Sequence, residues 1–459
     1  MNKRIAIIGA GISGLALSYA LRNAGYEVVV FEARSRAGGP IHTFERDGYR
    51  IETGPHSLLM RHQSVADLLD ELGLTDDIVD ADANAERRFI VRNGEPVPLP
   101  SSPIEAITTP LLSKAGRLRV LAEPFIGRTA EGAIDETLAS FVARRLGPEF
   151  LEYLVDPFVG GVWAGDPHRL SAQHSFPTLV ELERSGGSIA IGALKKKLSK
   201  SSDDDTIPRR LISFRDGMKS LVDALSEPLG DDLRLETPVR KLRRDDDGWR
   251  VIFARGKARR GETFDAVVST IPPDALARLE WENVDPPRPA IDELARMPYA
   301  PCCVVSLGIE RELVGHKLDG FGCLVPRVEQ FHILGSLFVS SMFPGRAPDG
   351  RVLLSVFIGG ARQPELCDAD DQTLVEMARH DLGRLLDLRG AAEFSHITRW
   401  DRAIPQYDVG HQVFLDSIAE LEEELPQIYF AGNYRDHIGL PNILRESRGH
   451  FRRIDDELG

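Results

Sequence analysis

The first 33 residues, MNKRIAIIGAGISGLALSYALRNAGYEVVVFEA, contain the motif that decides the fold. The continuous apolar run at residues 5–8 is typical of a buried parallel strand. Three glycines in the spacing G-x-G-x-x-G follow it, and apolar residues then recur at helical spacing before a second apolar run that ends at Glu32. The three glycines are Gly9, Gly11 and Gly14. The pattern predicts the strand, helix and strand of a dinucleotide-binding unit.

Each residue type in this unit has a physical role. Gly9 allows the tight turn, Gly11 lets a pyrophosphate approach the backbone, and Gly14 lets the helix pack closely on the strand. The amides at the start of the helix offer donors to a phosphate. Glu32 is expected to accept hydrogen bonds from a ribose 2′-hydroxyl, and its charge would repel the 2′-phosphate of NADP.

The same stretch also has a feature of a secretory signal, because Lys3 and Arg4 precede the apolar run. Such a signal would not be expected to continue into a second strand and an acidic residue. We therefore interpret the stretch as part of a folded domain.

Length and composition restrict the function. A chain of 459 residues predicts two or three domains, and 42% hydrophobic with 27% charged residues is typical of a globular protein. No run approaches the roughly 18 uncharged apolar residues of a membrane-spanning helix. A net charge of -14 argues against nucleic acid as a partner.

Cysteine and histidine patterns give no sign of a metal centre. The 4 cysteines lack paired metal-ligand spacing, and we expect them to be reduced, as in the cytoplasm. The 12 histidines include no HExxH motif. The sequence therefore predicts no metal site.

A second glycine motif favours FAD over NAD. The segment EARSRAGGPIHT places Gly38 and Gly39 shortly after the acidic residue, and DGYRIETGPHSLL follows. These segments resemble the second motif of glutathione-reductase-like flavoproteins, in which extended FAD lies beside the glycine pair. The alternative is a simple loop with a Gly-Gly turn.

The rest of the chain alternates between predicted strands and helices. A helix is expected over 64–74, a hairpin with an Asn-Gly turn over 87–103, and a helical region over 104–200. A hairpin around DDDG and a buried strand in ETFDAVVSTIPP follow. A β-rich region over 304–357, a helix near 371–388 and a final strand, Gly-Asn turn and helix complete the pattern.

Several longer segments are specific to one family. They are RRFIVRNGEPVPLPSSP, DPFVGGVWAGDPHRLSAQHSFPTLVELE, FGCLVP, GSLFVSSMFPGRAPDGRVLLSVFIGG and YFAGNYR. From about residue 4 to 453 the chain resembles the oxygen-dependent protoporphyrinogen IX oxidases, within the flavin amine oxidase group. The GGVWAGDPxxLS stretch is far more specific than any glycine motif.

The resemblance implies an α/β fold with three parts. A Rossmann-like FAD domain of the glutathione-reductase type would comprise residues 1–86, 206–279 and 408–459. A mixed-sheet substrate domain would comprise 87–98 and 280–407, and a helical domain that can contact a membrane would comprise 99–205.

The resemblance also implies site residues. The residues expected at the cofactor are Gly9, Gly11, Ile12, Ser13, Gly14, Glu32, Ala33, Gly38, Gly39, Gly54, Pro55, Val239, Gly432, Asn433 and Ile438. Val239 would contact the adenine through its backbone, and Gly432 with Asn433 would lie near the pyrophosphate. The residues expected around the substrate are Arg88, as partner of a propionate, with Gly160, Gly161, Leu324, Leu337 and Phe357. Without the resemblance, Arg88 would be taken for a solvated arginine and the apolar residues for core.

Two departures from the family pattern bear on FAD binding. Pro40 stands where relatives carry Arg, Lys or Asn, and proline has no backbone or side-chain donor. Asp436 and His437 replace a usual Gly-Gly. A carboxylate at a pyrophosphate-binding helix start would be repelled unless it caps the helix or points away.

These expectations describe an FAD-dependent oxidase that converts protoporphyrinogen IX to protoporphyrin IX with dioxygen as acceptor. No side chain is expected to act as an obligatory general base. The alternatives are a coproporphyrinogen III oxidase of the same family and a flavin- or porphyrin-binding protein without turnover; an amine oxidase or carotenoid desaturase is disfavoured by the PLPSSP and GDP segments. We expect a cytoplasmic protein. The mixed apolar and basic stretch 104–128 leaves a peripheral membrane contact open, and a homodimer is likewise left open.

Overall fold

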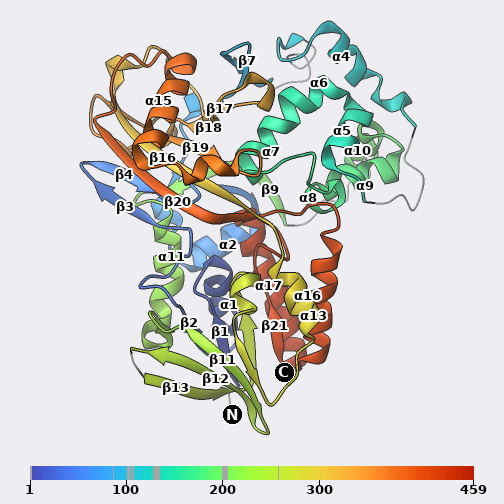
Figure 1. Cartoon of the computed structure of the whole chain (residues 1–459), viewed down its shortest axis with the longest axis vertical. Helices are drawn as coiled ribbons and strands as arrows, with labels where there is room; N and C mark the ends of the chain where they lie inside the picture. Colours follow the sequence, from blue (N-terminus) through green and yellow to red (C-terminus); the bar gives the residue numbers. More distant parts are fainter. Residues whose placement is uncertain are drawn as a thin grey trace.

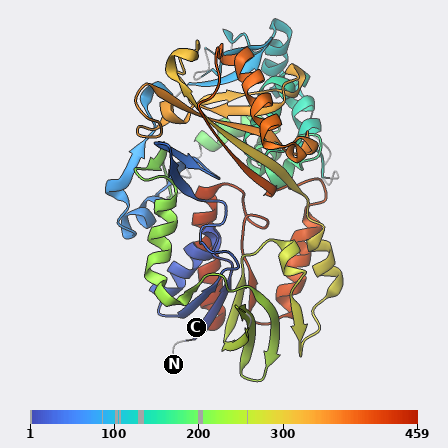
Figure 2. The same ribbon diagram turned by 60° about the vertical axis from the view of Figure 1, so that its left-hand side comes forward.

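The computed structural model describes residues 3–85, 87–100, 105, 108–127, 135–198, 205–256 and 258–459. Figure 1 and Figure 2 show two parts, one that contains both chain termini and one that contains the largest sheet and a group of helices. Of the mixed apolar and basic stretch 104–128, residues 104, 106, 107 and 128 lie outside the description. Residues 199 and 200, at the end of the predicted helical region, lie outside it as well.

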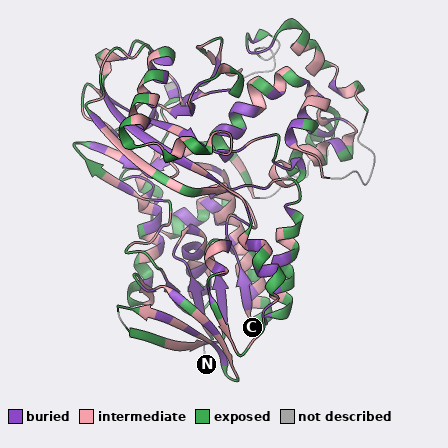
Figure 3. Cartoon of the chain, viewed as in Figure 1, coloured by how far each residue is buried: buried purple, intermediate pink, exposed green. Residues whose placement is uncertain are grey.

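A five-stranded parallel sheet forms the centre of the first part, as the glycine motif predicts. Its strand order is β10 (Leu233–Arg234), β2 (Glu27–Phe31), β1 (Arg4–Ile8), β14 (Ala266–Ser269) and β21 (Ile428–Phe430). Ile7 pairs with Val30 on one side and Val268 on the other. Strands β1, β2, β14 and β21 are buried along most of their length, which explains their continuous apolar runs (Figure 3).

Helices and a second sheet cover the two faces of this parallel sheet. One face packs on helices α1 (Ile12–Asn23), α11 (Lys219–Ser226) and α17 (Leu440–Leu458). The other face packs on β11 (Val239–Asp245), β12 (Gly248–Arg255), β13 (Ala258–Phe264), β15 (Glu280–Glu282), α13 (Arg288–Ala295) and α16 (Gln412–Glu424). Strands β11 and β12 are antiparallel around DDDG, so the predicted hairpin is confirmed.

A seven-stranded mixed sheet forms the second part. Its order is β20 (Phe394–Pro405), β16 (Tyr299–Glu310), β19 (Arg351–Gly359), β18 (Ile333–Leu337), β17 (Gly322–Leu324), β7 (Arg88–Arg92) and β8 (Glu95–Pro98). Strands β7 and β8 form the predicted Asn-Gly hairpin, and β17 pairs with β7 in parallel. Helix α15 (Asp371–Leu386) covers one face with buried leucines.

Smaller elements complete the two parts. They are β3 (Thr43–Arg46) with β4 (Tyr49–Glu52), the sheet of β5 (Leu58–His62), β9 (Thr206–Phe214) and β6 (Ile78–Asp80), and the helices α2 (Gln63–Glu71), α12 (Pro273–Leu276) and α14 (Val339–Met342). Helix α2 confirms the helix predicted over 64–74.

The region predicted to be helical consists mainly of helices, joined by short turns, in the residues that the structure describes. It contains α4 (Lys114–Leu121), η3 (Glu123–Phe125), α5 (Leu138–Leu146), α6 (Pro148–Phe150), the π-helical turn η4 (Leu151–Val155), α7 (Asp156–Trp163), α8 (Ala172–Ser175), α9 (Pro177–Gly186) and α10 (Ile189–Leu198). Every described helix of the chain is too short or too polar to span a bilayer.

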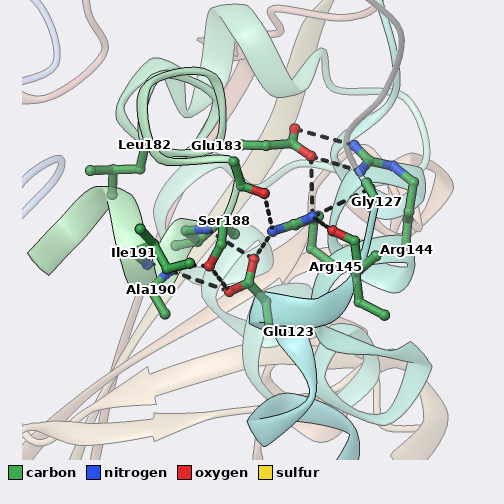
Figure 4. Close-up of polar contacts among 12 residues, drawn as sticks. Glu123, Gly127, Arg144, Arg145, Leu182, Glu183, Ser188, Ala190 and Ile191 are labelled. Atoms are coloured by element: carbon green, nitrogen blue, oxygen red, sulfur yellow. Dashed lines mark hydrogen bonds and ion pairs between the residues drawn. The ribbon is translucent and has the colours of Figure 1, made fainter. Parts of the chain in front are cut away.

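A buried ion pair holds these helices together (Figure 4). Arg145 of α5 and Glu123 of η3 are almost wholly buried and bonded to each other. Burial alone would raise the pKa of Glu123, but hydrogen bonds from Ser188, Ile189 and Ala190 outweigh it and hold this pKa below its ordinary value. Because both charged side chains are hydrogen-bonded to groups of the protein itself, we assign the pair a structural role.

Candidate functional site

The carboxyl ends of the parallel strands meet at one edge of the sheet, where open α/β folds bind ligands. After β1 the chain turns at Gly9, whose N–H donates to Phe31 O at 2.8 Å. The next N–H, that of Ala10, donates to Glu32 Oε2 at 2.9 Å. Thr270, which follows β14, donates from Oγ1 to Gly9 O at 3.0 Å. Groups from β2 and β14 therefore fix the first glycine turn.

The three glycines of the turn are required for different reasons. A Cβ on Gly14 would collide with the Gly9 carbonyl, and Gly9 itself has a φ of +106°, which favours glycine. Gly11, in contrast, has a φ of -71° and a ψ of 173°, a conformation open to any residue. Nothing lies within 4 Å of a Cβ built there. The protein's own packing thus explains Gly9 and Gly14, whereas open space at Gly11 suits a bound group.

Helix α1 begins at this open space. Gly11 is its N-cap and supplies no side-chain acceptor, so the first amides, at Ile12 and Ser13, have no side-chain cap. Uncapped amides and the positive end of a helix of 12 residues are features that favour an anion such as a phosphate, and phosphate binding here stays a prediction.

The second glycine pair packs directly against the first motif. Gly38 and Gly39 have φ values of +96° and +59°. The Gly38 N–H donates to Ala10 O at 2.7 Å, and Gly38 forms an isolated bridge with Gly11. A Cβ on Gly39 would stand 3.5 Å from Gly11 Cα. The two motifs therefore present one continuous strip of bare backbone.

The acidic end of β2 lies beside the start of β11. Glu32 Oε1 accepts from the Arg34 N–H at 2.8 Å, and the Thr237 N–H donates to Glu32 O at 2.7 Å. The exposed Ala33 and the mostly buried Val239 follow on these two segments. The structure thus brings Glu32, Ala33 and Val239 to the same end of the sheet as the glycines.

The C-terminal motif reaches the same edge. Gly432 and Asn433 follow β21, and Ile438 packs against the helical core that contains Trp163. Asp436, where the sequence suggests repulsion of a pyrophosphate, has its Oδ2 2.8 Å from His450 Nε2 on α17. The carboxylate therefore has a partner within the protein, which explains how the chain accommodates an aspartate at this position.

The other departure, Pro40, is accommodated by packing. Its carbonyl accepts from Thr53 Oγ1 at 2.9 Å. A Cβ on Gly54 would stand 2.5 Å from Pro40 O and 3.3 Å from Pro40 Cβ. Gly54 and the following Pro55 thus form a close-packed loop beside the glycine pair.

His56, which the sequence analysis did not single out, connects this loop to the large sheet. It is 5% exposed, and its Nε2 lies 2.8 Å from Ser355 Oγ on β19. Burial and then the charge of Arg346 lower its pKa to about 4, although a hydrogen bond with the Gly54 backbone opposes them. His56 is therefore a neutral side chain at neutral pH. A single histidine after Gly-Pro carries no sequence signal for this contact.

Two rows of residues run side by side across β7, β17, β18 and β19. The first row consists of Arg88, Gly322, Leu337 and Ser355. The second row consists of Ile90, Leu324, Gly335 and Phe357. Because the rows are two positions apart on each strand, their side chains share one face of the sheet. The predicted substrate residues of the sheet therefore lie together, and two glycines leave the face bare between them.

The face that carries the two rows is only partly buried: Ile90 and Ser355 are buried, but the three apolar residues on β17, β18 and β19 are more accessible. The residues that alternate with the apolar ones, namely Cys323, Ser336 and Val356, are buried. Leu324, Leu337 and Phe357 are only half-buried. A half-exposed apolar surface in the middle of a sheet is the type of surface that binds an apolar ligand.

Helix α7 lies against this face at Gly160 and Gly161. A Cβ on Gly161 would collide with Leu324, and one on Gly160 would collide with the guanidinium of Arg362. Arg362 is a second residue that the sequence analysis missed; its side chain is 5% exposed and lies 3.1 Å from Asp156 Oδ2. The two glycines thus have a packing reason, and their contact with a substrate stays a prediction.

The arginines beside the face differ in their partners. Arg92 pairs with Glu149 at 2.8 Å, and Arg362 with Asp156 as above. Arg88 is exposed, lies over the Phe321 ring at 5.3 Å, and forms no ion pair with any residue that the structure describes. Its charge is available for an anionic ligand.

The depressed pKa of His56 predicts an acid-sensitive protein. The folded state holds this pKa at about 4 against an ordinary value of 6.5, so the unfolded chain binds the proton first as pH falls. Stability is therefore lost between about pH 6.5 and pH 4. In urea titrations with excess FAD, His56→Gln should flatten this loss by up to about 1.4 kcal/mol per pH unit, while His168→Gln at an exposed site leaves it unchanged. Equal pH slopes for His56→Gln and the wild type would contradict the prediction.

Comparison with known proteins gives a consistent picture. The model of the family described as flavin containing amine oxidoreductase matches residues 12–440. The mitochondrial protoporphyrinogen oxidase of Nicotiana tabacum is 36% identical, with 96% of this chain and 92% of the relative covered. The coproporphyrinogen III oxidase of Staphylococcus aureus is 28% identical, with 100% of each covered.

Solved structures agree with the fold. The crystal structure of a putative protoporphyrinogen oxidase from Exiguobacterium sp. 255-15 has a TM-score of 0.81 and 25% identity, with 100% of this chain and 99% of the other covered. A putrescine oxidase variant has a TM-score of 0.69 at 20% identity, with 100% and 99% covered, and so supports the fold alone.

Proposed function

The chain belongs to the flavin-containing amine oxidoreductase family, and from this premise we propose that it oxidises protoporphyrinogen IX to protoporphyrin IX with dioxygen as electron acceptor. It is an FAD-dependent oxidoreductase, and its relatives include protoporphyrinogen and coproporphyrinogen III oxidases. The observation that carries the choice of substrate is the half-exposed apolar sheet face with Arg88 at its end. That face suits a flat, apolar ring system with a carboxylate side chain.

The proposed cofactor site is the strip of bare backbone at the sheet edge. Gly11, Ile12 and Ser13 would hold the pyrophosphate with backbone amides, and Glu32 would bind the adenosine ribose. The remaining proposed contacts are Gly9, Gly14, Ala33, Gly38, Gly39, Gly54, Pro55, Val239, Gly432, Asn433 and Ile438. Bound FAD supplies the two-electron redox chemistry, while the chain orients the substrate and excludes water.

The proposed substrate site uses the sheet face and α7. Leu324, Leu337 and Phe357 would bury the ring system, with Gly160 and Gly161 at its edge. The Arg88 guanidinium would bind a propionate in a two-point contact. His56 and Ser355 would hold the cofactor loop against this face. Because their side chains are hydrogen-bonded to each other, we propose that they position the loop and take no part in proton transfer.

A coproporphyrinogen III oxidase is the second candidate, because relatives with that name match 100% and 97% of the chain. The arginine partners favour the first candidate. A substrate with more carboxylates calls for more available cations, and two of the three arginines beside the face are paired with Glu149 and Asp156.

Substrate addition without oxygen tests the proposed reaction. The FAD-loaded protein is mixed anaerobically with protoporphyrinogen IX or with coproporphyrinogen III, and the visible flavin absorbance and porphyrin fluorescence are followed. We expect rapid bleaching with protoporphyrinogen IX and recovery on admission of dioxygen. A flavin that stays oxidised with both compounds would reject the oxidase, and faster bleaching with coproporphyrinogen III would select the second candidate.

We further propose that the helical region touches a membrane surface from the cytoplasm. Its exposed apolar residues repeat at helical spacing along α4, η3 and α10, and η3 packs on α10. They are Leu118, Leu121, Phe125, Ile191, Leu194 and Leu198. Phe125 is 89% exposed, and lysines lie on both α4 and α10. Apolar stripes with flanking lysines support contact with anionic lipids.

Vesicle sedimentation tests this contact. The wild type should sediment with vesicles of phosphatidylcholine and phosphatidylglycerol, and the double variant Phe125→Glu with Leu198→Glu should bind at least about tenfold more weakly. Val413→Glu on α16, also at an exposed apolar position, is the control and should bind as the wild type does. Undiminished binding of the double variant would contradict the proposed surface.

A further inference from the structure

Two histidines and an aspartate converge away from the site described above. His332 directly precedes β18, while His380 and Asp381 lie on α15. The Nδ1 atoms of His332 and His380 lie 3.3 Å and 3.0 Å from the same atom, Asp381 Oδ1. One ligand atom from each residue lies within 4.8 Å of the others, the one such group found among the described residues.

The backbone fixes the carboxylate of this group. Asp381 Oδ2 accepts from the N–H groups of His332 at 2.7 Å and Ile333 at 3.2 Å, and the side chain is fully buried. Its other oxygen is thereby held toward the two imidazoles, whose side chains are 44% and 62% exposed. The group thus combines an oriented ligand with an open approach from solvent, as metal sites with ordered outer contacts do.

The two separations between the imidazole nitrogens and Asp381 Oδ1 suit a shared ion. Zinc binds histidine nitrogen and carboxylate oxygen at about 2.0–2.2 Å, so two such ligands stand about 3.0 Å apart at a right angle and about 3.4 Å apart at a tetrahedral angle. The two nitrogen–oxygen distances fall within this range. Arg384, three residues further along α15, has its guanidinium over the Phe331 ring at 3.9 Å.

We propose that His332, His380 and Asp381 bind one divalent transition-metal ion of the zinc class, with water completing its coordination. Two imidazoles and one carboxylate favour zinc, cobalt, nickel or copper over magnesium and calcium. The ion would join α15 to the residue that directly precedes β18, the strand that carries Leu337, and so stabilise the folded sheet. His380 and Asp381 follow His332 by 48 and 49 residues along the chain. No short sequence motif therefore predicts the three ligands together.

Titration of the intact flavoprotein tests the site. Tag-free, FAD-loaded and chelator-treated protein is titrated with Zn²⁺ by calorimetry, and with Co²⁺ by visible absorbance. We expect one ion per chain, a Co²⁺ spectrum of low coordination number, and a thermal midpoint that rises with Zn²⁺ but not with Mg²⁺. His380→Ala and His332→Ala should each weaken binding at least tenfold. Exposed His168→Ala is the matched control and should bind as the wild type does.

Both histidines are partly exposed, so their removal should leave the fold intact, which FAD content and circular dichroism verify. Asp381→Asn is avoided because this side chain holds two backbone amides. A wild type that binds no Zn²⁺, or His332→Ala and His380→Ala variants that bind it as tightly as the wild type, would overturn the proposal.

Discussion

Gly11→Val should give a folded protein that is almost free of FAD. The backbone at Gly11 has an ordinary extended conformation, and nothing lies within 4 Å of an added Cβ, so the variant chain has no clash of its own to relieve. The valine methyl groups would instead fill the space in front of the first amides of α1. We expect FAD affinity to fall by about a hundredfold, equivalent to about 2.7 kcal/mol, because the pyrophosphate can no longer approach the backbone.

Two other glycines make this result interpretable. Gly127→Val places the same side chain at another open position, in the helical region, and should retain FAD. Gly14→Val should fail to fold, because its Cβ would collide with the Gly9 carbonyl. Flavin absorbance per chain and the thermal midpoint of the FAD-free protein separate these outcomes. A Gly11→Val variant that binds FAD normally would remove the proposed pyrophosphate site.

The contrast between Gly11 and Gly14 shows how far a sequence pattern can go. Local patterns predicted β1, α1, β2 and the hairpin of β7 and β8, because each depends on turn chemistry and side-chain period within about 30 residues. The G-x-G-x-x-G spacing alone does not distinguish a glycine required by packing from one required by a ligand. That distinction depends on the Gly9 carbonyl, which lies where a Cβ on Gly14 would stand and accepts a hydrogen bond from Thr270, more than 250 residues away.

The residues of the proposed substrate face likewise could not be predicted from local sequence patterns, because they come from strands that are distant along the chain. Arg88 and Phe357 became candidates through family resemblance, since nothing local separates them from a solvated arginine and a core phenylalanine. Only strand register places them in neighbouring rows of one face. Arg362 and His56 could not be predicted, because their partners, Asp156 and Ser355, lie in other parts of the chain.

Removal of the Arg88 side chain is expected to have the largest effect on turnover at low substrate concentration. Arg88 is exposed and forms no ion pair with a described residue, so Arg88→Ala leaves no buried charge behind and should fold normally. If the guanidinium binds a propionate, its loss removes a charge-assisted contact of about 1.5–3 kcal/mol. KM for protoporphyrinogen IX should rise about tenfold to a hundredfold, while kcat changes by less than about twofold, because the reacting atoms keep their surroundings.

The neighbouring arginine and a modified substrate separate recognition from general electrostatics. Arg87 has the same charge but already pairs with Asp319 at 2.9 Å, so Arg87→Ala should leave KM nearly unchanged. With the propionates converted to methyl esters, the wild type and Arg88→Ala should have the same KM, because the group that Arg88 binds is no longer charged. An equal rise in KM for the acid and the ester would show that Arg88 acts through packing on Phe321. An unchanged KM with the acid would place the propionate elsewhere on the sheet face.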